Sequence, residues 1–241
     1  KNPAFTEGGF VVGRLGWQSY SITSGDGVSQ IDPTLVPIQN YLGVCGMPGA
    51  TAWIGLLEIC EPKPGETVLV SAATGAVGSV VGQLAKAAGC RAVGIAGGTK
   101  KCSYAVDEIG FDACVDYKSG NLLKKLKEAC QDGVDCPFEN VGGEVSRAIA
   151  PLLNKGSRVP ICGFISQYNA EDMLKVETPF HVFGKIKPKP EHRFFVVTEW
   201  MNEWEYATKE ILKLVQEDKI KFKETITKGF GNAPQALRDV L

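Results

Sequence analysis

A glycine-containing segment in the first third of the chain has the residue types that hold a dinucleotide phosphate. It reads Ala72-Ala73-Thr74-Gly75-Ala76-Val77-Gly78 and directly follows the apolar run Thr67–Ser71. On the G-x-G-x-x-G pattern, Ala73 takes the first glycine position, while Gly75 and Gly78 take the second and third. Such glycines let a pyrophosphate approach the backbone at the amino end of a helix, where free N–H groups bind it. The segment therefore predicts a dinucleotide site, with a purely structural tight turn as the alternative.

The end of the next apolar run indicates which dinucleotide binds. A site for NAD places Asp or Glu there, about 20 residues after the glycines, to bind the adenosine ribose. Here the sequence reads Gly94-Ile95-Ala96-Gly97-Gly98-Thr99-Lys100-Lys101 and contains no carboxylate. Lysines beside an open glycine turn favour a 2′-phosphate, so the sequence predicts NADP(H) as the cofactor. The alternative is that Lys100 and Lys101 only begin a solvated helix.

Polar side chains also follow two later apolar runs. Tyr168 lies in Cys162-Gly163-Phe164-Ile165-Ser166-Gln167-Tyr168-Asn169, and Asn140 begins Asn140-Val141-Gly142-Gly143. Both segments come after predicted strands, so both should reach the sheet edge where ligands bind. A phenol there could stabilise developing negative charge, and Asn140 could donate a hydrogen bond. The alternative for Tyr168 is a buried tyrosine held by its ring.

The sequence contains no recognisable metal or hydrolase site. His181 and His192 are the only histidines, and neither lies near a cysteine at ligand spacing. No G-x-S-x-G segment is present. The eight cysteines form no C-x-x-C pair, which favours buried, reduced thiols and a cytoplasmic protein. We therefore expect no bound metal, and an activity that survives dialysis against a chelator.

The segments that position these residues alternate between strand and helix. Strands are expected at Thr67–Ser71, Arg91–Ile95, Ala113–Asp116, Val134–Glu139 and Ser157–Ile161. Helices are expected at Val77–Ala88, Lys100–Glu108, Leu122–Cys130 and Gly143–Leu153. This alternation predicts an α/β fold, a doubly wound parallel sheet of the Rossmann type. Pro137 and Pro160 fall inside two of the strands and predict either a shift of a residue or two, or irregular pairing.

The flanks of this alternating region have a different pattern. Short pieces such as Phe10–Val12 and Trp17–Tyr20, between glycine-rich turns, predict a small β unit in residues 1–42. An irregular stretch follows Ile161 and runs to Arg193. The elements expected after it are the strand Phe194–Val197, the helix Glu203–Asp218 and the half-exposed strand Lys219–Lys223.

Composition limits the classes of function. The 241 residues include 26 Lys and Arg against 27 Asp and Glu, a net charge of −1 that disfavours nucleic acid as a partner. No apolar run approaches the roughly 18 residues of a membrane helix, and no basic-then-apolar leader opens the chain. Because the first residue is not Met, we expect a fragment of a longer protein. These features predict a soluble protein with a small-molecule partner and no membrane.

Four segments together resemble a known family. They are Gly46-Met47-Pro48-Gly49-Ala50-Thr51-Ala52, Ala72 to Gly78, Glu139 to Gly143 and Cys162 to Asn169. In their order and spacing they resemble the zinc-independent medium-chain dehydrogenase/reductases, within these the prostaglandin reductase, leukotriene B4 12-hydroxydehydrogenase, alkenal double-bond reductase and curcumin reductase group. The resemblance covers nearly the whole chain. It implies an NADP-binding Rossmann domain at 44–213 and part of a GroES-like β catalytic domain at 1–43, to which 214–241 return.

The resemblance also implies an activity and its residues. The activity is hydride transfer from NADPH to the β-carbon of an α,β-unsaturated ketone or aldehyde, of the 15-oxoprostaglandin 13-reductase or 2-alkenal reductase type. Tyr168, with the ribose 2′-hydroxyl, would stabilise the enolate. The cofactor-binding residues would be Gly75, Ala76, Val77 and Gly78 for the pyrophosphate, Lys101 for the 2′-phosphate, Tyr117 on the adenosine side, Asn140, Cys162, Gly163, Phe164, Ile165, Ser166, Gln167 and Tyr168 around the nicotinamide, and Phe195, Val196 and Val197 near the carboxamide.

Departures from the family leave alternatives open. Family members carry a longer amino-terminal β domain and a further carboxy-terminal segment, and Glu139 replaces their more usual Asp. A quinone oxidoreductase on the same fold and a non-catalytic NADPH-binding protein are the alternative functions. The aromatic and basic stretch Phe180–Phe195 fits a substrate loop, with RNA contact as its alternative. A homodimer also stays open.

Overall fold

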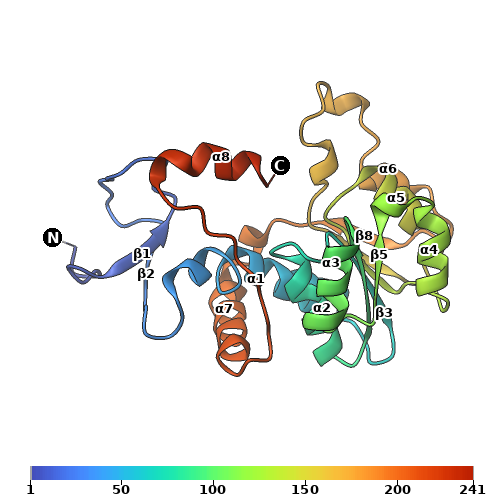
Figure 1. Ribbon diagram of the computed structural model, residues 1–241, viewed down its shortest axis with the longest axis horizontal. Helices are drawn as coiled ribbons and strands as arrows, with labels where there is room; N and C mark the ends of the chain where they lie inside the picture. Colours follow the sequence, from blue (N-terminus) through green and yellow to red (C-terminus); the bar gives the residue numbers. More distant parts are fainter. Residues whose placement is uncertain (1, 241) are drawn as a thin grey trace.

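A computed structural model describes residues 2–240, in which helices flank a parallel sheet beside a smaller β unit (Figure 1). The strands are β1 (Phe10–Gly13), β2 (Val28–Ile31), β3 (Thr67–Ser71), β4 (Arg91–Ala96), β5 (Ala113–Asp116), β6 (Cys136–Phe138), β7 (Arg158–Ile161) and β8 (Glu191–Phe194). The helices are α1 (Met47–Trp53), α2 (Gly78–Ala87), α3 (Thr99–Ser103), α4 (Leu122–Ala129), α5 (Gly143–Ile149), α6 (Pro179–Gly184), α7 (Met201–Gln216) and α8 (Ala233–Arg238).

The parallel sheet has the strand order of a dinucleotide-binding fold. β3 pairs with β4 and β6, β4 pairs with β5, and β7 pairs with β8, all in parallel. A bridge between Glu139 and Ile161 joins the β6 side to the β7 side. The resulting order, β5-β4-β3-β6-β7-β8, is that of a Rossmann sheet. The predicted α/β class and doubly wound parallel sheet are therefore confirmed.

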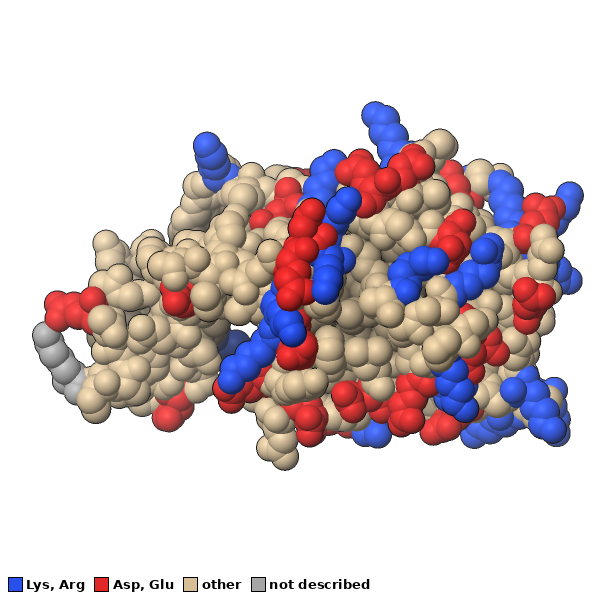
Figure 2. Space-filling view, turned by 90° about the horizontal axis from the view of Figure 1, so that it is seen from below, with Lys and Arg blue, Asp and Glu red and all other residues tan. Residues whose placement is uncertain are grey.

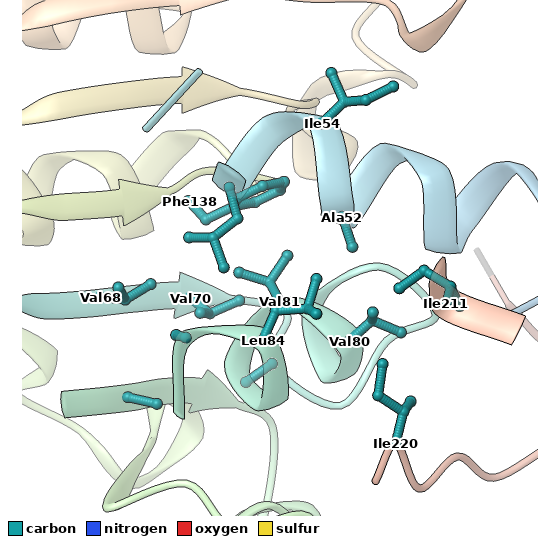
Figure 3. Close-up of a cluster of buried hydrophobic side chains, with 14 of the residues drawn as sticks. Ala52, Ile54, Val68, Val70, Val80, Val81, Leu84, Phe138, Ile211 and Ile220 are labelled. Atoms are coloured by element: carbon teal, nitrogen blue, oxygen red, sulfur yellow. The ribbon is translucent and has the colours of Figure 1, made fainter. Parts of the chain in front are cut away.

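β3 is buried along its whole length because helices pack on both of its faces. Val68 and Val70 point into a core that they share with Val81 and Leu84 of α2 (Figure 3). Leu69, between them, belongs to a second core on the opposite face, which α4 and α5 cover. Each such side chain contributes about 1.5–3 kcal/mol when it is fully buried. Packing on two faces fixes β3 and therefore the position of the glycine loop that follows it.

The two prolines lie where the ladder is irregular, as one of the two sequence alternatives predicts. β6 has only three residues, and Pro137 in it lies opposite Leu69 of β3. Between β6 and β7 there is one bridge, and the N–H of Glu139 donates to the carbonyl of Pro160 at 3.1 Å. Neither proline has an N–H to donate, so a continuous ladder cannot form here.

Predicted helices occur with small changes at their ends. α2 begins at Gly78, and α7 spans Met201–Gln216. A wider π-helical turn, Tyr104–Glu108, continues α3. α5 ends at Ile149 and is followed by the 3-10 turn Ala150–Leu152, which contains a proline without an N–H group.

Two strands predicted in the flanks are wrong. Trp17–Tyr20 contains no strand, and β2 pairs with β1 in its place. Lys219–Lys223 alternates as expected, with Ile220 buried, but it pairs with no strand. Instead, the N–H of Lys221 donates to Oε1 of Gln83 at 2.7 Å, and Nε2 of Gln83 donates to the Lys221 carbonyl at 2.8 Å. A glutamine side chain on α2 thus replaces the neighbouring strand.

The strand predicted at Phe194–Val197 is displaced. β8 ends at Phe194, because the N–H of Val196 donates to the carboxylate of Glu199 at 3.0 Å and a 3-10 turn begins at Val197. The stretch before it, expected to be irregular, contains α6 and most of β8. Both elements are short, which explains why their periodicity was too weak to identify them.

The segment before α1 contacts the end of α7 and the segment that follows it. Nδ2 of Asn40 donates to Glu224 at 2.8 Å, and Nε2 of Gln216 donates to the carbonyl of Leu35 at 3.3 Å. The end of the molecule with β1 and β2 shows few charged side chains, which gather elsewhere on the face seen in Figure 2. The domain division at 43 and 213 stays a prediction. Between residues 2 and 240, no helix is both long enough and apolar enough to cross a membrane.

Close packing of α2 gives a stability prediction. A Cβ added at Gly82 would lie 1.9 Å from the Phe111 ring, whereas one added at Gly184 would meet nothing within 4 Å. We expect Gly82→Ala to lower the free energy of unfolding by about 1–3 kcal/mol through overpacking. Gly184→Ala, the matched control, should not lower it. Urea unfolding of both variants checks this, and equal stabilities would contradict the packing.

Candidate dinucleotide and substrate site

The loop between β3 and α2 is a tight turn that only glycine can complete. Its N–H at Gly75 donates to the carbonyl of Ala72 at 2.9 Å. A Cβ added at Gly78 would lie 2.3 Å from that same carbonyl oxygen. Within residues 2–240, the N–H groups of Ala76, Val77 and Gly78 donate to no acceptor. Three of the four predicted pyrophosphate residues thus form a cluster of free donors at the amino end of a helix, which suits an anion.

The turn after β4 is held against the end of β5. The N–H of Gly98 donates to the carboxylate of Asp116 at 2.8 Å, and the N–H of Lys118 donates to the same oxygen at 2.9 Å. These bonds lower the pKa of Asp116 and keep it ionised. A Cβ added at Gly97 would lie 2.9 Å from the ring of Tyr117, so that ring lies directly over the turn. The structure therefore brings Tyr117 to the turn at Gly97, and its contact with adenosine stays a prediction.

Positive charge gathers around this turn. Lys100 and Lys101 are both exposed, and neither forms an ion pair with any carboxylate in the described part of the chain. Lys118, which the sequence analysis missed, has its Nζ 5.9 Å from the centre of the Tyr117 ring. Its position directly after Tyr117 was the available signal. These lysines could bind a phosphate on the adenosine ribose.

A buried carboxylate organises the other half of the site. Glu139, at the end of β6, is 0% exposed. Its Oε1 accepts from the hydroxyl of Ser71 at 2.9 Å and from the N–H groups of Val141 and Gly142 at 2.6 and 3.0 Å. Its Oε2 accepts from the hydroxyl of Ser146 at 2.8 Å. Sequence analysis noticed Glu139 only as a replacement for Asp and missed both serines, which no motif marks.

The segment after β7 is fastened to the segment after β6. The carbonyl of Glu139 accepts from the N–H groups of Cys162 and Gly163 at 2.8 and 3.2 Å. The N–H groups of Ile165 and Ser166 donate to the carbonyls of the next two residues, Asn140 and Val141, at 3.1 Å each. The structure thus brings the predicted residues Asn140 and Cys162 to Tyr168 together at one edge of the sheet.

Asn140 is partly committed to the fold. Its Nδ2 donates to the carbonyl of Ser71 at 2.7 Å, and its N–H donates to the Ser71 hydroxyl at 2.7 Å. One amide hydrogen therefore holds β6 to β3. The second hydrogen and Oδ1 are the groups that remain for a ligand.

Tyr168 projects its phenol over the backbone at the start of this segment. The side chain is 53% exposed, so the alternative of a buried tyrosine is wrong. Its oxygen accepts from the N–H of Phe164 at 3.3 Å, and the two rings meet edge to face at 5.4 Å. A Cβ added at Gly163 would lie 2.5 Å from that oxygen. The N–H contact leaves the phenol hydrogen available to a ligand.

Of the predicted residues Phe195, Val196 and Val197, Phe195 reaches this edge through its backbone. The N–H of Phe195 donates to the carbonyl of Ile161 at 3.3 Å, but its ring is 2% exposed and packs between Phe138 and Trp200. The rings of Phe164, Phe180 and Phe194 instead form an aromatic surface beside Tyr168, in which the centroid of Phe194 lies 6.4 Å from that of Phe164 and 6.1 Å from that of Phe180. Sequence analysis did not identify this surface, because its members come from separate segments.

No residues gather as metal ligands in the part of the chain that the structure describes. Residues 2–240 contain no group of three or more His, Cys, Asp and Glu side chains placed to hold a metal ion. Nδ1 of His181 lies 2.9 Å from the Thr178 hydroxyl, and Nδ1 of His192 lies 3.1 Å from the Pro190 carbonyl. Both histidines thus serve local contacts.

Similarity to known proteins places this geometry in a family. Residues 76–206, more than half of the chain, match the family described as "Zinc-binding dehydrogenase". The chain is 41% identical over 243 residues to NADPH-dependent curcumin reductase of Escherichia coli, covering 100% of this chain and 70% of that protein. It is 43% identical over 246 residues to prostaglandin reductase 1 of Rattus norvegicus, covering 100% of this chain and 74% of that protein.

The chain belongs to the medium-chain dehydrogenase/reductase family, in its zinc-independent group. The resemblance seen in the sequence is therefore confirmed. Among solved structures, CurA from Vibrio vulnificus in complex with NADPH has a TM-score of 0.84 and 39% identity, covering 93% of this chain and 68% of that one. This similarity also supports the interpretation of the β1–β2 region as part of a medium-chain reductase catalytic domain.

The turn after β4, Gly97–Lys101, is called the cationic turn below, and it gives a binding prediction. Lys101→Ala should weaken NADPH by about 1.5–3 kcal/mol, because a charge-assisted contact to the 2′-phosphate is lost, and should leave NADH nearly unchanged. Lys155→Ala, at another exposed lysine, is the control. Titration calorimetry with both cofactors measures the effect. Equal losses for NADPH and NADH would refute the assignment of Lys101.

The Glu139 contacts give a stability prediction. Glu139→Ala leaves the N–H groups of Val141 and Gly142 and the hydroxyl of Ser146 without an acceptor, so the free energy of unfolding should fall by about 2–4 kcal/mol. Glu139→Gln retains one acceptor oxygen and should cost less than about half of that. Glu128→Ala, on the exposed face of α4, should cost nothing. Denaturant unfolding would contradict this account if Ala and Gln were equally harmful at position 139.

Cys162 gives a prediction about reactivity. Burial, with a smaller contribution from the charge of Glu139, raises the pKa of this thiol from 9.0 to about 12. Because the thiolate is the nucleophile, alkylation by iodoacetamide at pH 8 should be about a thousandfold slower than for an unperturbed cysteine. Peptide mapping of native and urea-unfolded protein tests this. Equal labelling of Cys162 in the two states would be inconsistent with the raised pKa.

Proposed function

We propose that this protein uses NADPH to reduce the carbon–carbon double bond of α,β-unsaturated ketones and aldehydes, with hydride delivered to the β-carbon. The observation that carries the proposal is the half-exposed Tyr168, whose phenol is aimed over Gly163 at the sheet edge where ligands of this fold bind. Reductases of curcumin and prostaglandin among its relatives support the same class of reaction. The experiment below identifies which class of unsaturated carbonyl compound the protein reduces.

The chain offers matched partners for each part of NADPH. The free N–H groups at Ala76, Val77 and Gly78 suit the pyrophosphate. Lys101 and Lys118 suit the 2′-phosphate by charge. The segment after β7, held by Glu139, provides backbone next to the nicotinamide half. NADPH, when bound, supplies the hydride.

In this proposal the phenol of Tyr168 donates a hydrogen bond to the carbonyl oxygen of the substrate. Hydride arriving at the β-carbon moves negative charge onto the carbonyl oxygen of the substrate. A phenol hydrogen directed there stabilises the transition state more than the ground state. The aromatic surface of Phe164, Phe180 and Phe194 would bind the apolar part of the substrate and exclude water. Protonation of the resulting enolate at its α-carbon completes the saturated product.

A substrate panel tests the proposed function. Loss of NADPH absorbance is followed with an enone, an alkenal and a quinone, with NADH as the control cofactor, and the products are identified by mass spectrometry. We expect consumption of NADPH with the enone or alkenal and a saturated carbonyl product. Turnover with the quinone alone would favour the quinone oxidoreductase alternative. Tight NADPH binding without any turnover would favour a non-catalytic protein.

Tyr168→Phe tests the catalytic residue. The variant removes one donor and little volume, so kcat should fall by about 10²-fold while NADPH affinity is largely retained. Tyr206→Phe is a matched control, because Tyr206 on α7 is 54% exposed. Steady-state kinetics and NADPH titration separate the two constants. Loss of NADPH affinity with unchanged kcat would show that the phenol only orders the cofactor.

A further inference from the structure

Cys102 and Cys114 place two sulfur atoms next to each other on elements that frame the cationic turn. Cys102 lies in α3 and Cys114 in β5, and the Cys114 thiol donates to Sγ of Cys102 at 3.2 Å. Both side chains are half-buried rather than sealed in the core. A disulfide has an S–S length of about 2.05 Å, so roughly 1 Å of approach would form one. We propose that Cys102 and Cys114 are a reversible disulfide-forming pair that hydroperoxides oxidise.

The chemistry of this pair balances with a hydroperoxide as the oxidant. The sulfur of Cys102 attacks the peroxide, the O–O bond breaks, and a sulfenic acid and one molecule of water or alcohol form. The sulfur of Cys114 then attacks that of Cys102, the S–O bond breaks, and a second water leaves. The two thiols together lose two protons and two electrons, which reduce the peroxide. A dithiol reduces the disulfide back to the thiols.

The hydrogen bond between the thiols decides the order of these steps. Burial, followed by the neighbouring Cys102, raises the pKa of the Cys114 thiol well above its usual range. Cys114 therefore keeps its hydrogen and donates it, and Cys102 is the acceptor. The first oxidation should accordingly occur on Cys102.

A second neighbouring pair in the same chain provides an internal comparison. Cys60 and Cys136 also interact, but both are 0% exposed in the core. The Cys60 thiol donates to the carbonyl of Arg158 at 3.4 Å, and the guanidinium of Arg158 donates to Cys136 at 3.1 Å. A peroxide in solution cannot reach these sulfurs without local unfolding. Proximity alone would make both pairs react, whereas proximity with access selects Cys102 and Cys114.

The disulfide would also act on the cationic turn, a consequence that rests on the proposed function. Lys101 directly precedes Cys102, and Asp116, which holds the turn at Gly98, lies two residues after Cys114. Drawing α3 toward β5 therefore moves Lys101 relative to the residues around Tyr117. We expect the oxidised protein to bind NADPH less tightly than the reduced protein.

Peptide mapping without any cofactor tests the pair. The reduced protein is treated with hydrogen peroxide, free thiols are blocked with N-ethylmaleimide, and peptides are identified by mass spectrometry. We expect a Cys102–Cys114 crosslink that dithiothreitol removes, while Cys60 and Cys136 stay reduced. Cys102→Ser and Cys114→Ser should each abolish the crosslink, and Cys162→Ser should not. Oxidation of Cys102 to sulfinic acid without a crosslink, or equal oxidation of the buried pair, would overturn the proposal.

Titration of NADPH into the reduced and the oxidised protein tests the consequence. Oxidation should raise the Kd by about threefold or more in the natural chain and leave it unchanged in Cys114→Ser. A crosslinked protein with unchanged affinity would overturn the link to the turn. A reduced protein that binds no NADPH would instead refute the proposed function, and the crosslink measured without cofactor would stand.

Discussion

Glu139 is a buried carboxylate at the end of β6, where such a group is stable only if its oxygens accept hydrogen bonds. Its donors are the hydroxyls of Ser71 and Ser146 and two N–H groups of the loop after β6. These donors belong to β3, to α5 and to the loop that connects β6 to α5. One side chain therefore sets the relative position of three segments. The backbone carbonyl of the same residue holds the segment after β7. The irregular ladder caused by Pro137 and Pro160 makes this anchoring necessary, because regular strand pairing does not provide it.

The same principle applies to a second carboxylate near the proposed NADPH site. Asp116 and Glu139 both lie near the edge where the proposed NADPH site is, and backbone N–H groups bind both carboxylates. Among residues 2–240, the groups left for a ligand are therefore the free N–H donors after β3, the lysines after β4 that form no ion pair, and the phenol of Tyr168 after β7. A phosphate would meet N–H donors and lysine charge there, and a developing enolate would meet the phenol of Tyr168. The ligand-binding groups at this edge are thus the donors and lysines that do not bind Asp116 or Glu139.

Sequence reasoning predicted the central fold well, because buried parallel strands and the glycine loop have strong local signals. The run of strands from Thr67 to Ile161 and the loop at Gly75–Gly78 were identified from pattern alone. It failed where tertiary contacts replace pattern, as at Lys219–Lys223, whose alternation pairs with the side chain of Gln83. It also missed Ser71 and Lys118, since a hydroxyl under a buried carboxylate and one lysine among many have no distinctive spacing. The pattern of strands and helices placed the segment after β7 at the edge of the sheet. The cofactor-binding roles of Tyr117 and of that segment came from the resemblance to the family.

Delivery of hydride to the β-carbon of a conjugated carbonyl compound is the central claim, and isotope transfer tests it most directly. The protein is given an enone and NADPH that carries deuterium at the transferable position of the nicotinamide, and the product is analysed by nuclear magnetic resonance. The account predicts a saturated ketone with one deuterium on the β-carbon and an exchangeable solvent hydrogen on the α-carbon. Deuterium on the carbonyl carbon of an unsaturated alcohol would contradict the account.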